Sequence, residues 1–214
     1  MTPDVAPILQ IFAREPIPGA VKTRLAATIG VERAAAIYRE LTAVTLLNAR
    51  CAHAAGVIAA IELWCAPSTA SAWFHDCAAA AHASLHLQCD GDLGVRMGAA
   101  LASGLTRADG VLLIGTDCPV LDASALGEAG ELLSHYDAIL GPAEDGGYVL
   151  VGARVPIAFD GVRMSTASTA TDTLTALERA GIRCGLLPLS WDVDVAADLD
   201  RWERMRGTIN AATG

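Results

Sequence analysis

The chain has 214 residues, of which 53% are hydrophobic, and it carries 15 Lys and Arg against 24 Asp and Glu, a formal charge of −9. This length and composition exclude a disordered chain and predict one domain whose core needs neither disulfides nor a structural metal. The acidic balance argues against DNA or RNA as a partner, because binding to phosphate backbones needs a basic face.

The first twelve residues and the cysteines both indicate the cytoplasm. MTPDVAPILQIF has no basic region followed by a long apolar core, so it does not resemble a signal peptide, and no apolar run reaches membrane-spanning length. The six cysteines form no C-x-x-C pair, which excludes a zinc spacing and a dense disulfide framework. We expect a cytoplasmic protein without a membrane partner, whose thiols are reduced and mostly buried.

Short β-type runs alternate with longer segments of helical period. This alternation predicts an α/β fold of one domain, residues 1–214, with a mainly parallel twisted sheet and helices on both faces. Ligands of such sheets bind beyond the carboxyl ends of the strands, so the loops there are the candidate site. The predicted strands are Ile8–Ala13, Val57–Cys65, Leu85–Gln88, Val111–Gly115, Ala138–Gly141, Tyr148–Gly152 and Arg183–Leu187.

Apolar residues spaced three and four apart predict two helices that pack on the sheet. We expect further helices to begin at Asp122 as the N-cap, at Asp172 with an end at Gly181, and after Asp194. The two apolar stripes are Ile37, Leu41, Val44 and Leu47 within Glu32–Arg50, and Leu93, Met97, Leu101 and Leu105.

The loop Arg14–Leu25 joins the first strand to the first helix. Its two prolines and Gly19 predict a rigid turn, so the helix can begin only after it. Backbone N–H groups near Thr23 would then favour an anionic phosphate. Lys22 and Arg24 oppose the helix dipole at this position, which is explicable if a polyphosphate is their partner. A solvated first turn paired to nearby glutamates is the alternative.

Aspartates follow two of the predicted strands. Asp117 comes after the buried run Val111–Gly115, and its hard oxygens suit Mg²⁺ or Mn²⁺ bridging to ligand phosphates. The alternative, which we favour less, is that Asp117 satisfies the turn before a proline. Asp192 and Asp194 lie on one side of an extended segment, so both could face the cleft.

The role of Asp194 stays open between two alternatives. It is the expected N-cap of the last helix, and it is equally a candidate metal ligand. Asp198 belongs to the first turn of that helix, where a negative side chain is stabilising without a catalytic role.

The segment Gln88–Met97 joins a strand to a helix. Gly91 and Gly94 let a flat ring approach the backbone, and Gln88 could read a nucleobase edge. For Asp92 an N-cap, and for Arg96 a surface charge, are the stronger alternatives.

A tight turn between strands is predicted at Leu140–Tyr148 by its Asp-Gly pair. Its side chains could also line an acceptor pocket. Ser165 opens a run of Ser and Thr that either closes over a ligand or forms a solvated loop. The candidate acceptor contacts are Glu144, Asp145, Gly146, Gly147, Tyr148 and Ser165. The five histidines lie away from these loops, so a Ser-His-Asp arrangement has little support.

Five segments in order, VKTRLA, QCDGDLGVRM, GTDCP, GPAEDGGYVLVG and WDVDVAADL, cover almost the whole chain. With them the chain resembles the bacterial glycosyltransferase-A-like family known as selenodomain-associated transferases. The KTRL segment and the late D-x-D also resemble those of 2-phospholactate guanylyltransferase, molybdenum-cofactor nucleotidyltransferases and CMP-sugar synthetases. The resemblance implies a Rossmann-like nucleotide-diphospho-sugar transferase (GT-A) fold, a nucleotide held by the first loop and a divalent ion held by two carboxylates.

Position by position, Lys22 and Arg24 match the phosphate-binding loop of these families. Asp117 matches the metal-binding Asp after the central strand, and Asp194 matches the late metal ligand. Two departures stand out: Val195, Ala196 and Ala197 replace the middle of a late motif that commonly reads D-T-P-E-D-L, and Met164 precedes Ser165 where the family has Trp.

Together these features predict a Mg²⁺-dependent transferase with a nucleotide donor. The two loop cations favour a triphosphate donor, and so nucleotidyl transfer to a small phosphorylated or sugar-like acceptor. Glycosyl transfer from an NDP-sugar and nucleotide binding without turnover are the alternatives. The predicted catalytic residues are Lys22, Arg24 and Asp117; the nucleotide contacts are Arg14, Gly19, Lys22, Thr23, Arg24, Gln88, Gly91, Asp92, Gly94 and Arg96; the metal ligands are Asp117, Asp194 and Asp192.

Overall fold

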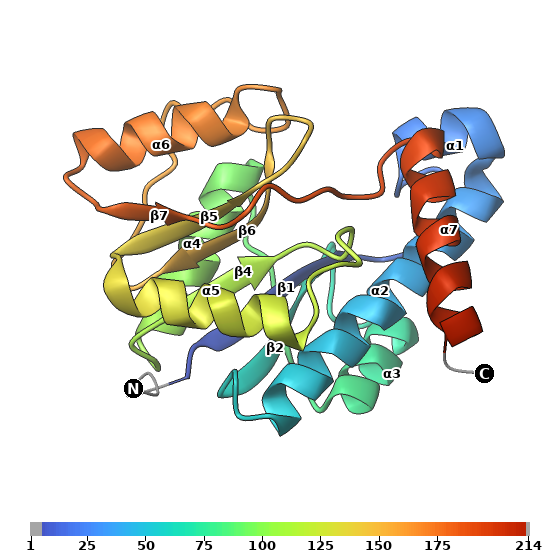
Figure 1. The fold of residues 1–214 in the computed structure, drawn as a ribbon, viewed down its shortest axis with the longest axis horizontal. Coiled ribbons are helices and arrows are strands. Elements are labelled where there is room, and N and C mark those ends of the chain that lie inside the picture. The colour runs from blue at the N-terminus through green and yellow to red at the C-terminus, as the bar shows by residue number, and fades with distance from the viewer. Residues whose placement is uncertain (1–5, 213–214) are drawn as a thin grey trace.

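The computed structural model describes residues 6–212 and contains one seven-stranded sheet, shown in Figure 1. The strand order is β3-β2-β1-β4-β6-β5-β7. β6 runs antiparallel to both of its neighbours, and the other pairs are parallel, so the expected mainly parallel sheet is confirmed. The strands are β1 Ile8–Arg14, β2 Ala60–Ala66, β3 Ser84–Leu87, β4 Val111–Ile114, β5 Ala138–Pro142, β6 Tyr148–Ala153 and β7 Cys184–Leu186.

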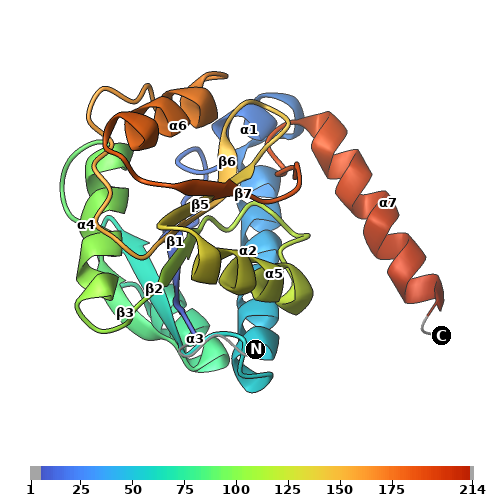
Figure 2. The ribbon, with the colours of Figure 1, turned by 60° about the vertical axis from the view of Figure 1, so that its left-hand side comes forward.

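Helices cover both faces of the sheet, as expected, with α2, α3 and α5 on one face and α4 and α6 on the other (Figures 1 and 2). Leu9 and Ile11 of β1 point into the first layer, where Phe74 and Leu126 meet them. The second layer contains Leu101 and its neighbours from α4 and α6. The helices are α1 Thr23–Ile29, α2 Val31–Ala54, α3 Ala72–Ala81, α4 Leu93–Leu105, α5 Ala123–His135, α6 Thr169–Arg179 and α7 Ala196–Ala212.

The apolar stripe predicted for α2 packs against another helix, so its expected contact with the sheet is wrong. Ile37 and Leu41 belong to a cluster with Trp202 of α7, and Leu47 is 49% exposed. The sheet is contacted instead by Leu46 and by small alanines of the same helix. The large aliphatic residues dominate the periodic pattern, whereas the alanines are what allow α2 to approach the sheet closely.

Of two helix starts predicted from the sequence, one is confirmed and the other is wrong. Asp122 is the N-cap of α5, since its Oδ1 accepts a hydrogen bond from the Ala125 N–H at 2.9 Å. The expected start at Asp172 is wrong, because α6 begins at Thr169 with Ser168 as its N-cap. Asp172 lies in the first turn and pairs with Arg163, with 2.8 Å between Arg163 Nε and Asp172 Oδ2. A carboxylate in a first turn is stabilising without capping it.

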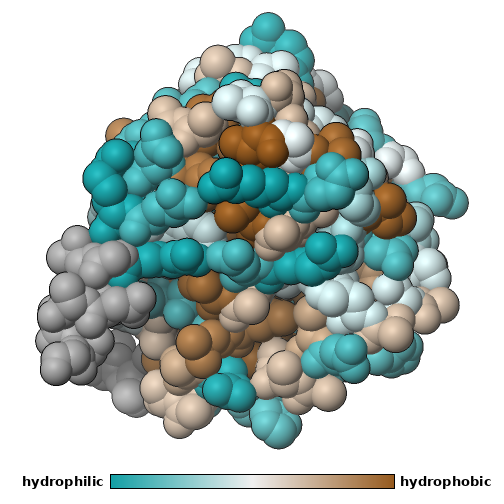
Figure 3. Space-filling view, turned by 90° about the vertical axis from the view of Figure 1, so that its right-hand side faces the viewer, coloured by the Kyte–Doolittle hydropathy of each residue, from teal (hydrophilic) through white to brown (hydrophobic). Residues whose placement is uncertain are grey.

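Helix α7 docks on α1 and α2 at one side of the sheet. Trp202 is 1% exposed within the cluster that joins these helices. Ion pairs flank the contact: Arg206 Nη1 lies 2.6 Å from Glu40 Oε2, and Arg33 Nη2 lies 3.8 Å from Glu203 Oε1. In Figure 3, which faces this side, hydrophilic residues run in bands with hydrophobic residues between them.

The six cysteines are free thiols, of which Cys65 and Cys118 are buried and Cys51 and Cys89 are exposed. The expectation that most of them are buried is therefore wrong. Within residues 6–212, no helix combines the length and hydropathy that a membrane span needs.

A polar network lies inside the layer between the sheet and α4. Glu62 is 4% exposed, and its Oε2 accepts hydrogen bonds from Gln10 Nε2 at 3.1 Å and Trp64 Nε1 at 3.0 Å. Its Oε1 lies 2.6 Å from Arg107 Nη2. Burial alone would raise the pKa of Glu62, but the hydrogen bonds from Arg107, Trp64 and Gln10 hold it below its ordinary value of 4.5.

We expect Glu62→Gln to lower the free energy of unfolding at pH 7 by about 1–3 kcal/mol, because Arg107 and its neighbours lose a charged acceptor. The folded-state pKa is depressed, so this stability is complete above the unfolded pKa and is lost as pH falls through the folded one. Urea unfolding between pH 7 and pH 3 measures it. The variant should lose less stability than the parent on acidification, and Glu131→Gln, at an exposed site on α5, should match the parent.

Candidate functional site

The carboxyl ends of β1, β4, β5 and β7 lie at the same edge of the sheet. β1 pairs with β2 on one side and with β4 on the other, so the chain leaves this point in opposite directions and a crevice results. β6 returns antiparallel between β4 and β5, which brings the turn after β5 to that edge as well. Four loops distant in sequence therefore meet there.

The loop after β1 adopts the predicted turn, and α1 begins after it at Thr23. Gly19 has a φ of 82° and the Ala20 N–H donates to the Ile17 carbonyl at 2.9 Å. Lys22 is the N-cap and has left-handed backbone angles, φ 47° and ψ 45°. Such a conformation is rare for a residue with a Cβ and clusters at functional sites.

Lys22 at the end of this loop and Arg24 in the first turn of α1 each contact an acid from a distant part of the chain. Lys22 Nζ lies 2.8 Å from Asp117 Oδ2, with side-chain exposures of 3% and 40%. Arg24 Nη1 donates to Asp194 Oδ2. The four side chains thus converge as two ion pairs, and the buried ammonium of Lys22 is neutralised by Asp117.

The extended segment after β7 brings its acids to the same place. The Ser190 N–H donates to the Pro142 carbonyl at 2.8 Å, and the Val193 N–H donates to the Asp117 carbonyl at 2.9 Å. Val193 is fully buried, so its neighbours Asp192 and Asp194 lie on the opposite side of the segment. Each of the two acids lines one of the two cavities described below, Asp192 the one and Asp194 the other.

The helix α7 is capped by Asp198 and not by Asp194. Asp198 Oδ2 accepts hydrogen bonds from the N–H groups of Asp194 at 3.0 Å and Val195 at 2.8 Å, as the third residue of a capping box does. The expected N-cap role of the Asp194 side chain is therefore wrong. Its carboxylate faces Arg24 instead.

Positive side chains gather in one cavity of about 450 Å³, which we call the basic cavity. Arg14, Lys22, Arg24 and Arg96 line it, together with Thr23, Gln88, Asp117 and Asp194. Gln88 is buried and positions other groups: its Nε2 donates to the Trp64 carbonyl at 2.8 Å, and its Oε1 accepts from Arg96 Nη1 at 3.0 Å. Arg96 is thereby directed to the cavity.

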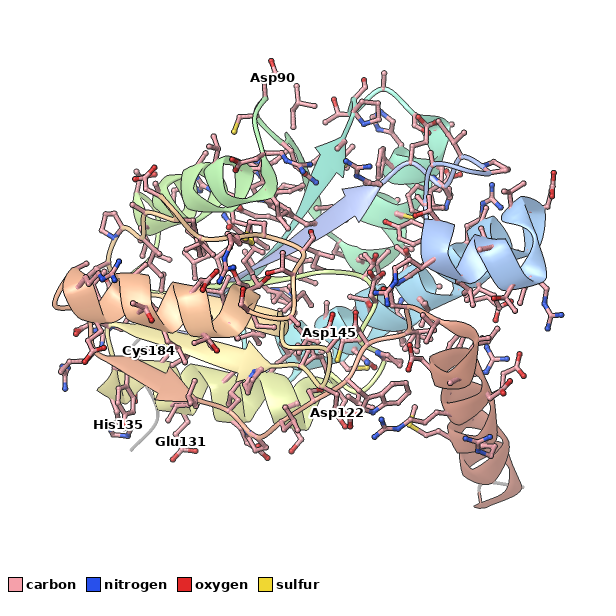
Figure 4. The ribbon with its side chains drawn as sticks, turned by 90° about the horizontal axis from the view of Figure 1, so that it is seen from above. Asp90, Asp122, Glu131, His135, Asp145 and Cys184 are labelled. Atoms are coloured by element: carbon pink, nitrogen blue, oxygen red, sulfur yellow. The ribbon has the colours of Figure 1, made fainter. Side chains whose placement is uncertain are left out.

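A second cavity, of about 350 Å³, lies beside the first, and we call it the acidic cavity. Asp117, Asp145 and Asp192 line it, with walls that include Met97, Val149, Val151, Tyr148, Met164 and Thr166. Figure 4 places Asp145 near the centre of the molecule, whereas Glu131 and His135 lie at its outer edge. The two cavities share Phe12, Leu93, Gly115, Asp117 and Ser165.

Three carboxylates line the acidic cavity and act on one another. Burial and the charge of Asp145 raise the pKa of Asp192 to about 6, and Asp117 and Asp194 act in the same direction, against the lowering effect of Lys22. Two unit charges at about 4 Å near a protein surface interact by roughly 4 kcal/mol. An anion entering this cavity meets three carboxylates, whereas the basic cavity offers four cations against two carboxylates.

Several predicted contacts have structural partners and do not line either cavity. Asp92 is the N-cap of α4, accepting from the Val95 N–H at 2.9 Å, and Glu144 pairs with Arg201 of α7, 3.0 Å between Oε2 and Nη1. A Cβ at Gly94 would meet Phe159 Cβ at 2.9 Å, so that glycine allows close packing. The predicted contacts outside the cavity linings are Gly19, Gly91, Asp92, Gly94, Glu144 and Gly146.

Sequence reasoning missed several residues of the site. Tyr38 of α2 lines the basic cavity, and its hydroxyl accepts from the Arg14 N–H at 2.8 Å. Burial raises the pKa of Tyr38 to about 12. Phe12 is identifiable only as one residue of an apolar strand. Thr116, which lines the basic cavity beside Asp117, could have been predicted from the sequence, because it belongs to the same strand-end motif as Asp117.

The carboxylates of the site are the candidate ligands for a divalent cation. Across residues 6–212, no group of three or more His, Cys, Asp and Glu side chains has a geometry that would hold a metal ion. Asp117, however, borders both cavities with its side chain 40% exposed. Mg²⁺ usually takes one or two protein carboxylates, several waters and substrate phosphates. The residues therefore fit an ion that arrives with a phosphate ligand.

The chain matches one sequence family and several solved structures. Residues 48–166 match the family described as "Uncharacterized protein conserved in bacteria (DUF2064)". A protein from Desulfovibrio desulfuricans G20, provisionally described as a nucleotide-diphospho-sugar transferase, is 31% identical, with 89% of this chain and 83% of that chain covered and a TM-score of 0.77. None of the curated proteins compared with the chain matches it.

Two more distant structures share the fold. A CMP:2-keto-3-deoxy-manno-octonic acid synthetase in complex with CTP is 13% identical, with a TM-score of 0.52 over 95% of this chain and 99% of that one. Rv0371C from Mycobacterium tuberculosis H37Rv, in complex with manganese, is 17% identical, with a TM-score of 0.51 over 92% and 97%. These likenesses confirm the expected nucleotide-diphospho-sugar transferase type of fold.

The turn after β5 is packed against the Ser and Thr run. The Ala170 N–H donates to the Gly146 carbonyl at 3.0 Å, and a Cβ on Gly146, which has φ +87°, would lie 2.1 Å from the Ala167 carbonyl oxygen. This contact holds the turn that carries Asp145 against the run that begins at Ser165, and both residues line the acidic cavity.

We expect Gly146→Ala to lower the free energy of unfolding by about 2–5 kcal/mol, from left-handed strain of about 1–2 kcal/mol and overpacking of about 1–3 kcal/mol. Gly161→Ala is the matched control, since Gly161 has φ +76° with nothing within 4 Å of the added Cβ. It should show the strain alone. Urea denaturation of both variants measures the difference, and equal losses would contradict the contact.

Proposed function

We propose that the chain, which belongs to the DUF2064 family, is a metal-dependent transferase with a nucleotide donor. Its fold is similar to the folds of nucleotide-dependent transferases. One observation carries the proposal: Lys22, at the end of the loop after β1, and Arg24, in the first turn of α1, meet Asp117 and Asp194 from the loops after β4 and β7. Cations and oxygen ligands at one cavity are the groups that bind a metal-chelated polyphosphate.

The basic cavity is the donor site. Its four cationic side chains outnumber its two carboxylates, Asp117 and Asp194, in a chain whose overall charge is −9. Phosphate oxygens would compete with those carboxylates for Lys22 and Arg24. This excess of positive charge favours a nucleoside triphosphate over a sugar diphosphate.

Asp117, with Asp192 or Asp194, would hold the Mg²⁺ or Mn²⁺. When bound, the ion neutralises charge on the phosphates. A fold neighbour in complex with manganese and another in complex with CTP support this assignment. The protein contributes position and charge: Lys22 and Arg24 orient the phosphates and stabilise the negative charge that develops on the leaving group.

The proposed reaction is nucleotidyl transfer to a small acceptor. The acceptor oxygen bonds to the α-phosphorus as the bond from that phosphorus to the α,β-bridging oxygen breaks. Pyrophosphate leaves with the electron pair of the broken bond, and the acceptor hydroxyl proton passes to solvent water. Release of pyrophosphate with a nucleoside triphosphate and an acceptor is the direct test.

Glycosyl transfer from an NDP-sugar is the second candidate. The 31% identical protein provisionally described as a nucleotide-diphospho-sugar transferase favours it. The same assay separates the two reactions, because glycosyl transfer leaves a nucleoside diphosphate and releases no pyrophosphate. Sugar transfer without pyrophosphate would replace the nucleotidyl proposal.

We expect Lys22→Gln and Arg24→Gln each to reduce kcat/KM by about 10²–10³-fold, as the loss of one charge-stabilising group does in other enzymes. Steady-state pyrophosphate release measures the effect. Arg183→Gln removes a cation that pairs with Asp137 away from both cavities, so it should keep the parental rate. Parental activity in the Lys22 variant would contradict the assigned role.

We expect Mg²⁺ to tighten binding of a nucleoside triphosphate about tenfold or more, which is about 1.4 kcal/mol. Asp117→Asn should abolish that gain because the amide is a poorer ligand for the ion. Calorimetric titration with and without Mg²⁺ measures both affinities, and Asp160→Asn, at an exposed loop position, is the control. An affinity for the nucleoside triphosphate that changes neither with Mg²⁺ nor with the Asp117 substitution would rule out the metal-bridged mechanism.

A further inference from the structure

The two cavities divide the charges of the site between them. All four cations that border the site line the basic cavity. Among the described residues that line the acidic cavity, three are aspartates and none is Lys, Arg or His. Lys22 is held on the other side, with its ammonium bonded to Asp117 on the border between the cavities. The charge of Lys22 lowers the pKa of Asp192, but no Lys, Arg or His among the described residues lines the acidic cavity itself. Asp145 is not among the carboxylates that would hold the ion, so it faces an acceptor in either arrangement of the metal ligands.

The lining of the acidic cavity combines apolar side chains with carboxylates. Phe12, Met97, Val149 and Met164 give it a hydrophobic surface, and the three aspartates give it hydrogen-bond acceptors. Asp145 has one oxygen engaged, since its Oδ1 accepts from the Gly147 N–H at 2.8 Å. Carboxylates accept hydrogen bonds from hydroxyl or ammonium groups and repel phosphates.

We propose that the acidic cavity binds the acceptor, and that the acceptor is an alcohol without phosphate, sulfate or carboxylate groups. The inference rests on the proposed transfer function and narrows it: of the phosphorylated and sugar-like acceptors expected from the sequence, it retains only the uncharged or cationic class. The volume of about 350 Å³ lies at the small end of ligand pockets, which fits an acceptor of few atoms.

The positions of the two cavities agree with the direction of the proposed nucleotidyl transfer. Asp117 borders both cavities, so a donor phosphate beside Lys22 lies next to an acceptor beside Asp145 and Asp192. The acceptor hydroxyl then reaches the phosphorus from the acidic cavity, and the pyrophosphate leaves within the basic cavity, where its charge is stabilised.

The test compares matched acceptors that differ only in a phosphate group. The whole chain is assayed with Mg²⁺ and each nucleoside triphosphate against glycerol and glycerol 3-phosphate, glucose and glucose 1-phosphate, and glucosamine and glucosamine 6-phosphate, in which every phosphorylated member keeps free hydroxyls. Pyrophosphate release and product mass are the readouts. We expect kcat/KM for the unphosphorylated member to exceed that of its partner by at least about 100-fold. Equal or better use of the phosphorylated members would overturn the inference and leave the transfer function standing.

A charge reversal provides the matched variant. Asp145→Lys should move the preference toward the phosphorylated members by about tenfold or more, because it places a cation in the acidic cavity. Asp160→Lys makes the same change at an exposed position outside both cavities and should leave the preference unchanged. Identical preferences in the Asp145 variant and the parent would contradict the assigned cavity.

A binding arm separates this inference from the proposed function. If no pair supports turnover, ligand-observed NMR with the same six compounds shows which ones bind and whether Asp145→Lys alters their binding. If only the unphosphorylated compounds bind, and Asp145→Lys abolishes or reverses that preference, the inferred acceptor class stands even though the proposed transfer reaction fails. Failure of every unphosphorylated compound to bind would overturn the inference.

Discussion

The ion pair between Lys22 and Asp117 organises the site. A lysine whose side chain is 3% exposed needs a negative partner at close range. The ion pair therefore holds the loop after β1 against the loop after β4. The carbonyl of Asp117 in turn accepts from the Val193 N–H, which adds the segment after β7. Because one residue holds both neighbouring segments, the two cavities and their charges are placed relative to each other by a single carboxylate and its backbone.

The fold was largely predictable because its strands are short apolar runs separated by helical periods. The limits of that reasoning lie in packing. In α2, the large aliphatics Ile37 and Leu41 suggested the face that meets the sheet, yet alanines make that contact and the aliphatics pack with α7. The Ala-rich helix α3 gave no distinct period and was not predicted. β2 begins at Ala60 rather than Val57 because the Val57 N–H is used at the end of α2, donating to Ala52.

The acids of the site were predictable from topology, since residues that follow parallel strands reach the same edge of a sheet. Their division into two cavities was not. It depends on Phe12, Leu93 and Ser165, which come from a strand, a helix and a loop and carry no shared sequence signal. The capping by Asp198 was also beyond the pattern, because either acid suits a helix start and only the geometry decides between them.

The order in which the chain contributes these parts has a consequence for biogenesis. Every strand of the sheet precedes residue 187, whereas Asp192, Asp194 and the helix that anchors them come afterwards. A nascent chain on the ribosome can neutralise Lys22 once residue 117 has emerged, and it can complete its sheet before the last acids are available. The crevice is complete only when the segment after β7 crosses the open edge, where the Ser190 and Val193 N–H groups bind the carbonyls of Pro142 and Asp117, and α7 packs on α1 and α2.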